Sequence, residues 1–139
     1  MRTSFSLRWL PPLLWATAIF YLSSQSRPLG RRWPSLPAAL AHVFEFAVLA
    51  ALLHRALAAE PQRRQRAIAP AFVLAALYAA SDEVHQFSVP ERTASLSEYR
   101  LDLLGTSLGL GLSQWWARLP DGQARLSVRQ ARRHRGEGA

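Results

Sequence analysis

The sequence contains no cysteine and no lysine, and its single methionine is Met1. Without cysteine or an internal methionine the chain has no disulfide and no sulfur ligand for a metal, so histidine and carboxylate are the remaining metal ligands. All 17 basic residues are therefore arginine, and with nine acidic residues they give a net charge of +8. The arginines flank apolar runs instead of lining one compact surface. We therefore expect anionic lipid headgroups, and no nucleic acid, as their partner.

Four long apolar segments predict an all-α membrane protein. A helix of about 20 residues crosses the hydrocarbon core of a bilayer, and segments of that length occupy residues 7–24, 38–59, 67–87 and 98–117. The first segment resembles a signal peptide, but no small-residue cleavage site follows it, so we expect an uncleaved helix. The predicted fold is a bundle of four transmembrane helices over residues 1–119, followed by a basic, disordered cytoplasmic tail over residues 120–139.

The distribution of arginine predicts the orientation of this bundle in the lipid bilayer. With four spans, the N-terminus, the connector at residues 60–66 and the C-terminus share one side. That side carries twelve of the 17 arginines, and the other side carries five. Because positively charged segments stay in the cytoplasm, we predict a multi-pass protein of the inner (plasma) membrane with both termini cytoplasmic. His54 and Arg55, at the cytoplasmic end of the second span, are expected to extend into the headgroups.

Polar residues gather at the opposite side of the predicted bundle. Because consecutive spans alternate in direction, the end of the first and third and the start of the second and fourth lie in one layer. Polar side chains are costly inside a bilayer and often mark functional sites. The candidate catalytic residues of this layer, which include five of the nine carboxyl groups, are His42, Glu45, Asp82, Glu83, His85, Glu98 and Asp102. The candidate ligand-binding residues are Gln86 and Arg92.

Three kinds of chemistry fit these residue types. Di-metal helix bundles place two ligands one helical turn apart, as in His42-x-x-Glu45, so a divalent metal is one candidate cofactor. The same spacing recurs in Asp82-x-x-His85. Acid–base chemistry is the second kind. Crowding raises the pKa of some carboxyl groups, which leaves one acid and one base near neutral pH, and His42 or His85 can carry the proton between them. Recognition without catalysis is the third, with Arg92 holding a phosphate or carboxylate.

A structural role is the alternative to all three. Polar residues inside helix bundles often satisfy one another and fix the order of the helices. We expect this role for Ser23, Ser24, Gln25 and Gln86. Function is favoured for His42, Glu45, Asp82, Glu83, His85 and Arg92.

The segment SDEVHQFSVPER, residues 81–92, and the following SLSEYRLDLLGTSLG, residues 95–109, together resemble the pattern of the VanZ-like membrane proteins. The resemblance covers about residues 15 to 112. The matching positions are His42, Asp82, Glu83, His85, Gln86, Pro90, Arg92, Glu98, Asp102, Gly105 and Gly109. Two positions depart from the family pattern: Glu91 replaces the usual glycine of the turn, and Glu98 stands where aspartate is more usual. Neither departure removes a candidate reactive group.

The resemblance implies a small multi-span membrane protein of the bacterial cell envelope. We expect it to act on, or bind, a cell-envelope or lipid-linked ligand such as a cell-wall precursor at the outer leaflet. Asp82, Glu83 and His85 would then carry out acid–base chemistry or bind a metal, and Arg92 would bind an anionic group. The alternative is a non-catalytic envelope protein whose polar layer is structural or only binds a ligand. An ion or proton carrier ranks third, because polar residues thin out toward the cytoplasmic half.

Overall fold

The structure is a computed structural model, and it describes residues 5–25, 36–58, 61–90, 92 and 94–118. The helices are α1 (Phe5–Ser23), α2 (Leu36–Leu57), α3 (Ile68–Phe87) and α4 (Leu96–Arg118), with a short 3-10 helix, η1 (Pro61–Arg63), before α3. No strand occurs in these described ranges, so the all-helical prediction is confirmed. The predicted tail, residues 120–139, lies outside them.

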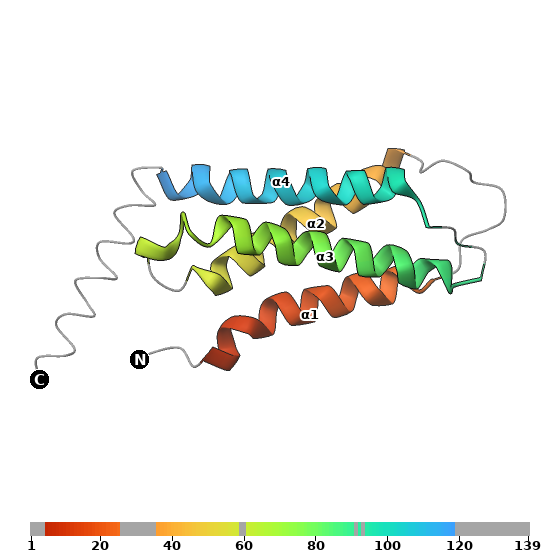
Figure 1. Cartoon of the computed structure of the whole chain (residues 1–139), viewed down its shortest axis with the longest axis horizontal. Helices are drawn as coiled ribbons and strands as arrows, with labels where there is room; N and C mark the ends of the chain where they lie inside the picture. Colours follow the sequence, from red (N-terminus) through yellow and green to blue (C-terminus); the bar gives the residue numbers. More distant parts are fainter. Residues whose placement is uncertain (1–4, 26–35, 59–60, 91, 93, 119–139) are drawn as a thin grey trace, which may run out of the picture.

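The four helices run alternately in opposite directions along one bundle (Figure 1). α1 and α3 end, and α2 and α4 begin, at the same end, which we call the polar end; the opposite end is the far end. The helices contain 19, 22, 20 and 23 residues. At 1.5 Å per residue each is therefore roughly 30 Å long.

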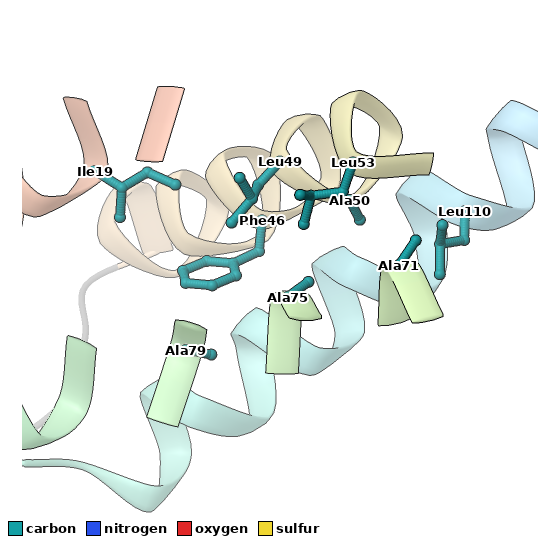
Figure 2. Close-up of a cluster of buried hydrophobic side chains, with 9 residues drawn as sticks. All are labelled: Ile19, Phe46, Leu49, Ala50, Leu53, Ala71, Ala75, Ala79 and Leu110. Atoms are coloured by element: carbon teal, nitrogen blue, oxygen red, sulfur yellow. The ribbon is translucent and has the colours of Figure 1, made fainter. Parts of the chain in front are cut away.

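The apolar core lies where α2 meets its neighbours (Figure 2). Large side chains come from α2, where Phe46 is 0% and Leu49 is 1% exposed. The fully buried side chains that α3 contributes are methyl groups, those of Ala71, Ala75 and Ala79. Because residues four apart share one face of a helix, these alanines form a continuous stripe. The backbone of α3 can therefore approach α2 closely.

Two hydrogen bonds attach the middle of α1 to the other helices. The indole Nε1 of Trp15 donates to the main-chain carbonyl of Glu45 in α2 over 2.9 Å. The hydroxyl of Tyr78 in α3 donates to the main-chain carbonyl of Ala16 over 2.6 Å. Ile19 adds an apolar side chain that is 2% exposed. α1 is thus fixed to both α2 and α3.

Two glycines allow α4 to pack more extensively on α2 than any other pair of helices packs. Gly105 faces the backbone of Val43, and Gly109 faces the backbone of Ala47. An added Cβ at either glycine would overlap the carbonyl oxygen of the residue that it faces. Gly111, by contrast, faces open space. The four-residue spacing of the first two glycines therefore sets the distance between α2 and α4.

His54 corrects one expectation from the sequence. It was expected to extend into the headgroups, but it is only 5% exposed. Its ring Nε2 lies 3.0 Å from the main-chain oxygen of Arg64 and 3.0 Å from the side-chain nitrogen of Gln114. The connector between α2 and α3 folds back over the end of α2, and this contact is what covers the imidazole.

Apolar side chains also cover the outside of the bundle. Among the described residues, α2 is the one helix that is long and apolar enough by itself to cross a membrane. Each of the four helices nevertheless exposes large apolar side chains, such as Leu14 at 61%, Phe44 at 61%, Leu77 at 62% and Leu112 at 60%. The four helices are confirmed, and four membrane crossings stay a prediction.

Candidate functional site

The buried faces of the helices continue into polar residues at the polar end. His42 lies four residues before the core residue Phe46 in α2, and Glu83 lies four residues after Ala79 in α3. Residues at this spacing share a helix face, so the packing that buries the core also buries the polar groups. The buried polar residues in this half of the bundle are Ser23, His42, Asp82, Glu83, Gln86, Glu98, Asp102 and Thr106.

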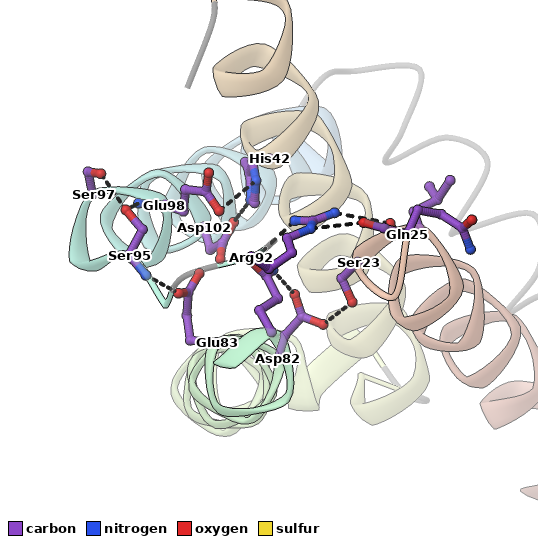
Figure 3. A network of polar contacts seen from close by, with 12 residues as sticks. Ser23, Gln25, His42, Asp82, Glu83, Arg92, Ser95, Ser97, Glu98 and Asp102 are labelled. Atoms are coloured by element: carbon purple, nitrogen blue, oxygen red, sulfur yellow. Dashed lines mark hydrogen bonds and ion pairs between the residues drawn. The ribbon is translucent and has the colours of Figure 1, made fainter. Parts of the chain in front are cut away.

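His42 lies between two carboxyl groups of α4 (Figure 3). Its Nδ1 is 2.9 Å from Oδ1 of Asp102, and its Nε2 is 3.5 Å from Oε2 of Glu98. No side chain of the three is more than 9% exposed. Glu98 and Asp102 are four residues apart, so both face α2. We call these three residues the His42 cluster.

Asp82 of α3 accepts two hydrogen bonds from neighbouring side chains. The hydroxyl of Ser23, at the end of α1, donates to Oδ1 over 2.6 Å. The amide Nε2 of Gln86, one turn later in α3, donates to Oδ2 over 2.8 Å. Both oxygens of this buried carboxyl group therefore have a donor, and Asp82 links α1 to α3.

Arg92 extends these contacts to the end of α1 (Figure 3). Its Nη1 donates to Oε1 of Gln86 over 3.2 Å. Its Nε donates to the carbonyl of Gln25 over 3.0 Å, and its Nη2 donates to the carbonyl of Leu22 over 3.2 Å. The last carbonyls of a helix lack intrahelical donors and favour a cation, so Arg92 caps α1. We call Ser23, Asp82, Gln86 and Arg92 the Asp82 network.

Glu83 connects α3 to the start of α4. Its Oε2 accepts a hydrogen bond of 2.6 Å from the main-chain nitrogen of Ser95, the residue just before α4. The hydroxyl of Ser95 in turn accepts a hydrogen bond of 3.4 Å from the main-chain nitrogen of Glu98. Ser95 is therefore the N-cap of α4, and Glu83 supplies the acceptor that a glutamate inside the helix provides in a capping box.

Three buried oxygen atoms have no hydrogen-bond partner within the described part of the chain. They are Oε1 of Glu83, Oδ2 of Asp102 and Oγ1 of Thr106. Leaving a buried polar atom unpaired costs about 1–3 kcal/mol, so each such atom in a native protein calls for an explanation. Two of the three belong to carboxyl groups whose other oxygen is bonded. Glu83 and Asp102 can therefore each accept one further hydrogen bond.

Two of the predicted site residues, His85 and Glu45, belong to none of these groups. His85 is half-buried against α1, where its ring stacks on Phe20 with centroids 4.3 Å apart and its Nε2 is 3.0 Å from the hydroxyl of Ser24. Glu45 is half-buried in α2, and its carbonyl accepts the indole of Trp15. The remaining predicted residues belong to the His42 cluster, to the Asp82 network or, for Glu83, to the start of α4.

The sequence interpretation missed Ser95 and Thr106. Ser95 could have been found, because serine followed three residues later by Glu98 is the pattern of a helix N-terminus. Thr106 has only its position, four residues after Asp102, to indicate that it shares the buried face.

The described residues contain no group of three or more histidine, aspartate or glutamate side chains arranged to hold a metal ion. The two helical pairs that suggested a metal do not converge. His42 faces α4, whereas His85 faces α1. The donors present do not fit a metal centre, and we assign none to this site.

The molecule is thus an all-helical protein that buries a histidine and its carboxyl partners at one end of the bundle. The VanZ/LLP1 family model matches residues 8–117. This match covers most of the sequence, so the chain belongs to the VanZ/LLP1 family, and the resemblance drawn from its motifs is confirmed. The matched range contains every residue of the His42 cluster and the Asp82 network. No curated protein and no solved structure gives a significant match.

Proposed function

We propose that the chain is a four-span protein of the cell envelope whose His42 cluster performs acid–base chemistry on an envelope or lipid-linked ligand. Each helix is long enough to cross the hydrocarbon core, and each exposes large apolar side chains, which suit lipid better than water. The charged residues that make α3 and α4 less apolar include Asp82, Glu83, Glu98 and Asp102. All four are buried inside the bundle, so they would not contact lipid.

The distribution of arginine supports an orientation with the polar end at the outer leaflet. In a four-span topology, twelve of the 17 arginines belong to sequence segments on the side of the membrane opposite to the polar end, and positively charged segments stay in the cytoplasm. A fluorescent protein fused after Ala139 is therefore expected to fluoresce, and alkaline phosphatase fused there to be inactive. Active phosphatase at this position would overturn the orientation.

The observation that carries the proposed chemistry is the position of His42 between Asp102 and Glu98. When Nδ1 donates to an ionised Asp102, the ring is held in one orientation and one tautomer. Nε2 is then the nitrogen that accepts a proton, and Glu98, 3.5 Å away, is the carboxyl group that can exchange it. In this proposal His42 and Glu98 transfer the proton, and Asp102 positions the imidazole.

The second candidate function is a structural role, and the hydrogen bonds of the Asp82 network favour it for the residues of that network. Both oxygens of Asp82 are bonded inside the protein, and Gln86 bonds to both Asp82 and Arg92. Paired polar groups of this kind fix the order and rotation of helices. Ligand binding by Gln86 and Arg92 stays a prediction.

Two isosteric substitutions separate the two roles, because each removes one buried charge and nearly no volume. Asp102→Asn is expected to keep the folded yield in detergent close to that of the wild type and to abolish rescue of a deletion strain under envelope stress. Asp82→Asn is expected to lower the yield, because it weakens the links between α1 and α3. His85→Ala is the control, since His85 lies outside both groups, and it should leave rescue unchanged. Full rescue by Asp102→Asn would contradict acid–base chemistry at His42.

A further inference from the structure

A groove of about 540 Å³ runs between α2 and α4 in the far half of the bundle. Small residues line its base, namely Ala47 and Ala51 of α2 and Gly109 of α4. Gly109, which has no side chain, lies against the backbone of Ala47. Phe44 and Leu112, 61% and 60% exposed, form apolar walls. Most of the groove is therefore an apolar channel that is open along one side.

One end of the groove is basic. Arg55, in the last turn of α2, and Arg64, in the connector before α3, both line it, and no acidic side chain of the described residues does. The contact of 3.0 Å between the ring of His54 and the carbonyl of Arg64 holds this connector against α2. Trp116 lines the same end, and tryptophan is enriched at the level of the lipid headgroups.

We propose that this groove binds one anionic phospholipid, with an acyl chain between α2 and α4 and the phosphate at Arg55 and Arg64. The planar guanidinium group pairs well with phosphate oxygens. From Phe44 to Ala58 a helix rises about 21 Å, which is sufficient for the hydrocarbon half-thickness of one leaflet, about 15 Å. In the orientation proposed above, the basic end lies in the cytoplasmic leaflet, where anionic lipids gather. This inference rests on the proposed membrane insertion and is independent of the chemistry at His42.

Lipid binding can be measured by native mass spectrometry of the full chain in a non-ionic detergent, with dioleoyl phosphatidylglycerol and dioleoyl phosphatidylcholine added separately. The wild type is expected to bind one phosphatidylglycerol about 30-fold more tightly than phosphatidylcholine, from two arginine contacts near the headgroup at about 1 kcal/mol each. Arg55→Gln combined with Arg64→Gln should abolish this preference. Arg63→Gln combined with Arg66→Gln is the matched control, because it removes the same charge from residues that do not line the groove. Ala51→Phe fills the channel and should weaken binding of both lipids.

Equal affinity of the wild type for the two lipids would overturn the inference. So would an equal loss of preference in both double variants, because that result means a general surface charge. Unchanged lipid binding by Ala51→Phe would show that the acyl chain of the lipid does not lie in this groove. Circular dichroism of each variant identifies loss of fold separately. Recovery of the wild type in the soluble fraction without detergent would overturn membrane insertion as well, whereas the other outcomes overturn the groove alone.

Discussion

Gly105→Ala tests the contact between α2 and α4 that holds the His42 cluster together. A Cβ at this position would come within 2.9 Å of two backbone carbons of Val43, where 3.4 Å is the lower limit of ordinary contact. The obstructing atoms are main chain and cannot rotate away, so the helices must separate. Overpacking of this kind costs about 1–3 kcal/mol, and the upper half of that range applies to a rigid backbone.

Gly111→Ala is the matched control for this prediction. Its Cβ would meet nothing within 4 Å, and it lies in the same helix. Replacing glycine by alanine inside a helix stabilises it by about 1 kcal/mol, and this gain is common to both variants. The difference in free energy of unfolding between Gly111→Ala and Gly105→Ala therefore reports the steric cost alone, about 2–3 kcal/mol.

The assay is reversible unfolding of each variant in mixed micelles with increasing dodecyl sulfate, followed by far-ultraviolet circular dichroism. Gly111→Ala is expected to unfold at a higher dodecyl sulfate fraction than the wild type, and Gly105→Ala at a lower one. Equal midpoints for the two variants would refute the close approach of α4 to Val43. Because Val43 follows His42 directly, Gly105→Ala should also impair rescue of the deletion strain.

Two further predictions concern single hydrogen bonds, each measured in the same unfolding assay. Ser95→Ala removes the N-cap of α4 and should lower the free energy of unfolding by about 1 kcal/mol. Ser107→Ala, at an exposed position of the same helix, is the control and should leave it unchanged. Equal free energies of unfolding for the two variants would exclude the capping role. Tyr78→Phe removes the bond from α3 to the carbonyl of Ala16 in α1 and should cost about 1 kcal/mol, whereas Tyr21→Phe, 66% exposed, should be silent. Equal stability of Tyr78→Phe and the wild type would mean that this bond does not help to hold α1.

The sequence predicts which residues reach the polar end but not how they pair. Alternating helices and four-residue spacing are sufficient to bring His42, Asp82 and Asp102 to the same end. Pairing depends on the rotation of each helix about its axis, which contacts with other helices decide. Spacing alone pairs His42 with Glu45 one turn away. The hydrogen bond in the structure is with Asp102, 60 residues later in the chain.

His85 and His54 are two other residues whose contacts the sequence does not predict. The spacing Asp82-x-x-His85 suggests a common ligand, but three residues on a helix correspond to about 300° of rotation. That offset is sufficient to turn Asp82 into the bundle and His85 onto Phe20. For His54 the missing information is the path of the connector, which brings the carbonyl of Arg64 over the ring. Hydropathy along a span contains no information about either.

The alanine stripe of α3 determines what fixes this helix along its own axis. The buried apolar residues of α3 are Ala71, Ala75 and Ala79, each with one methyl group. Sliding α3 by one turn, about 5.4 Å, exchanges one methyl for the next, so the stripe itself hardly opposes such a shift. The axial position of α3 then depends on the partly buried Ile68, Phe72 and Tyr78, which pack against the core, and on polar bonds. These bonds run from Asp82 and Tyr78 to α1 and from Glu83 to the start of α4. The carboxyl groups at the polar end therefore help to set the axial position of the helix that carries them.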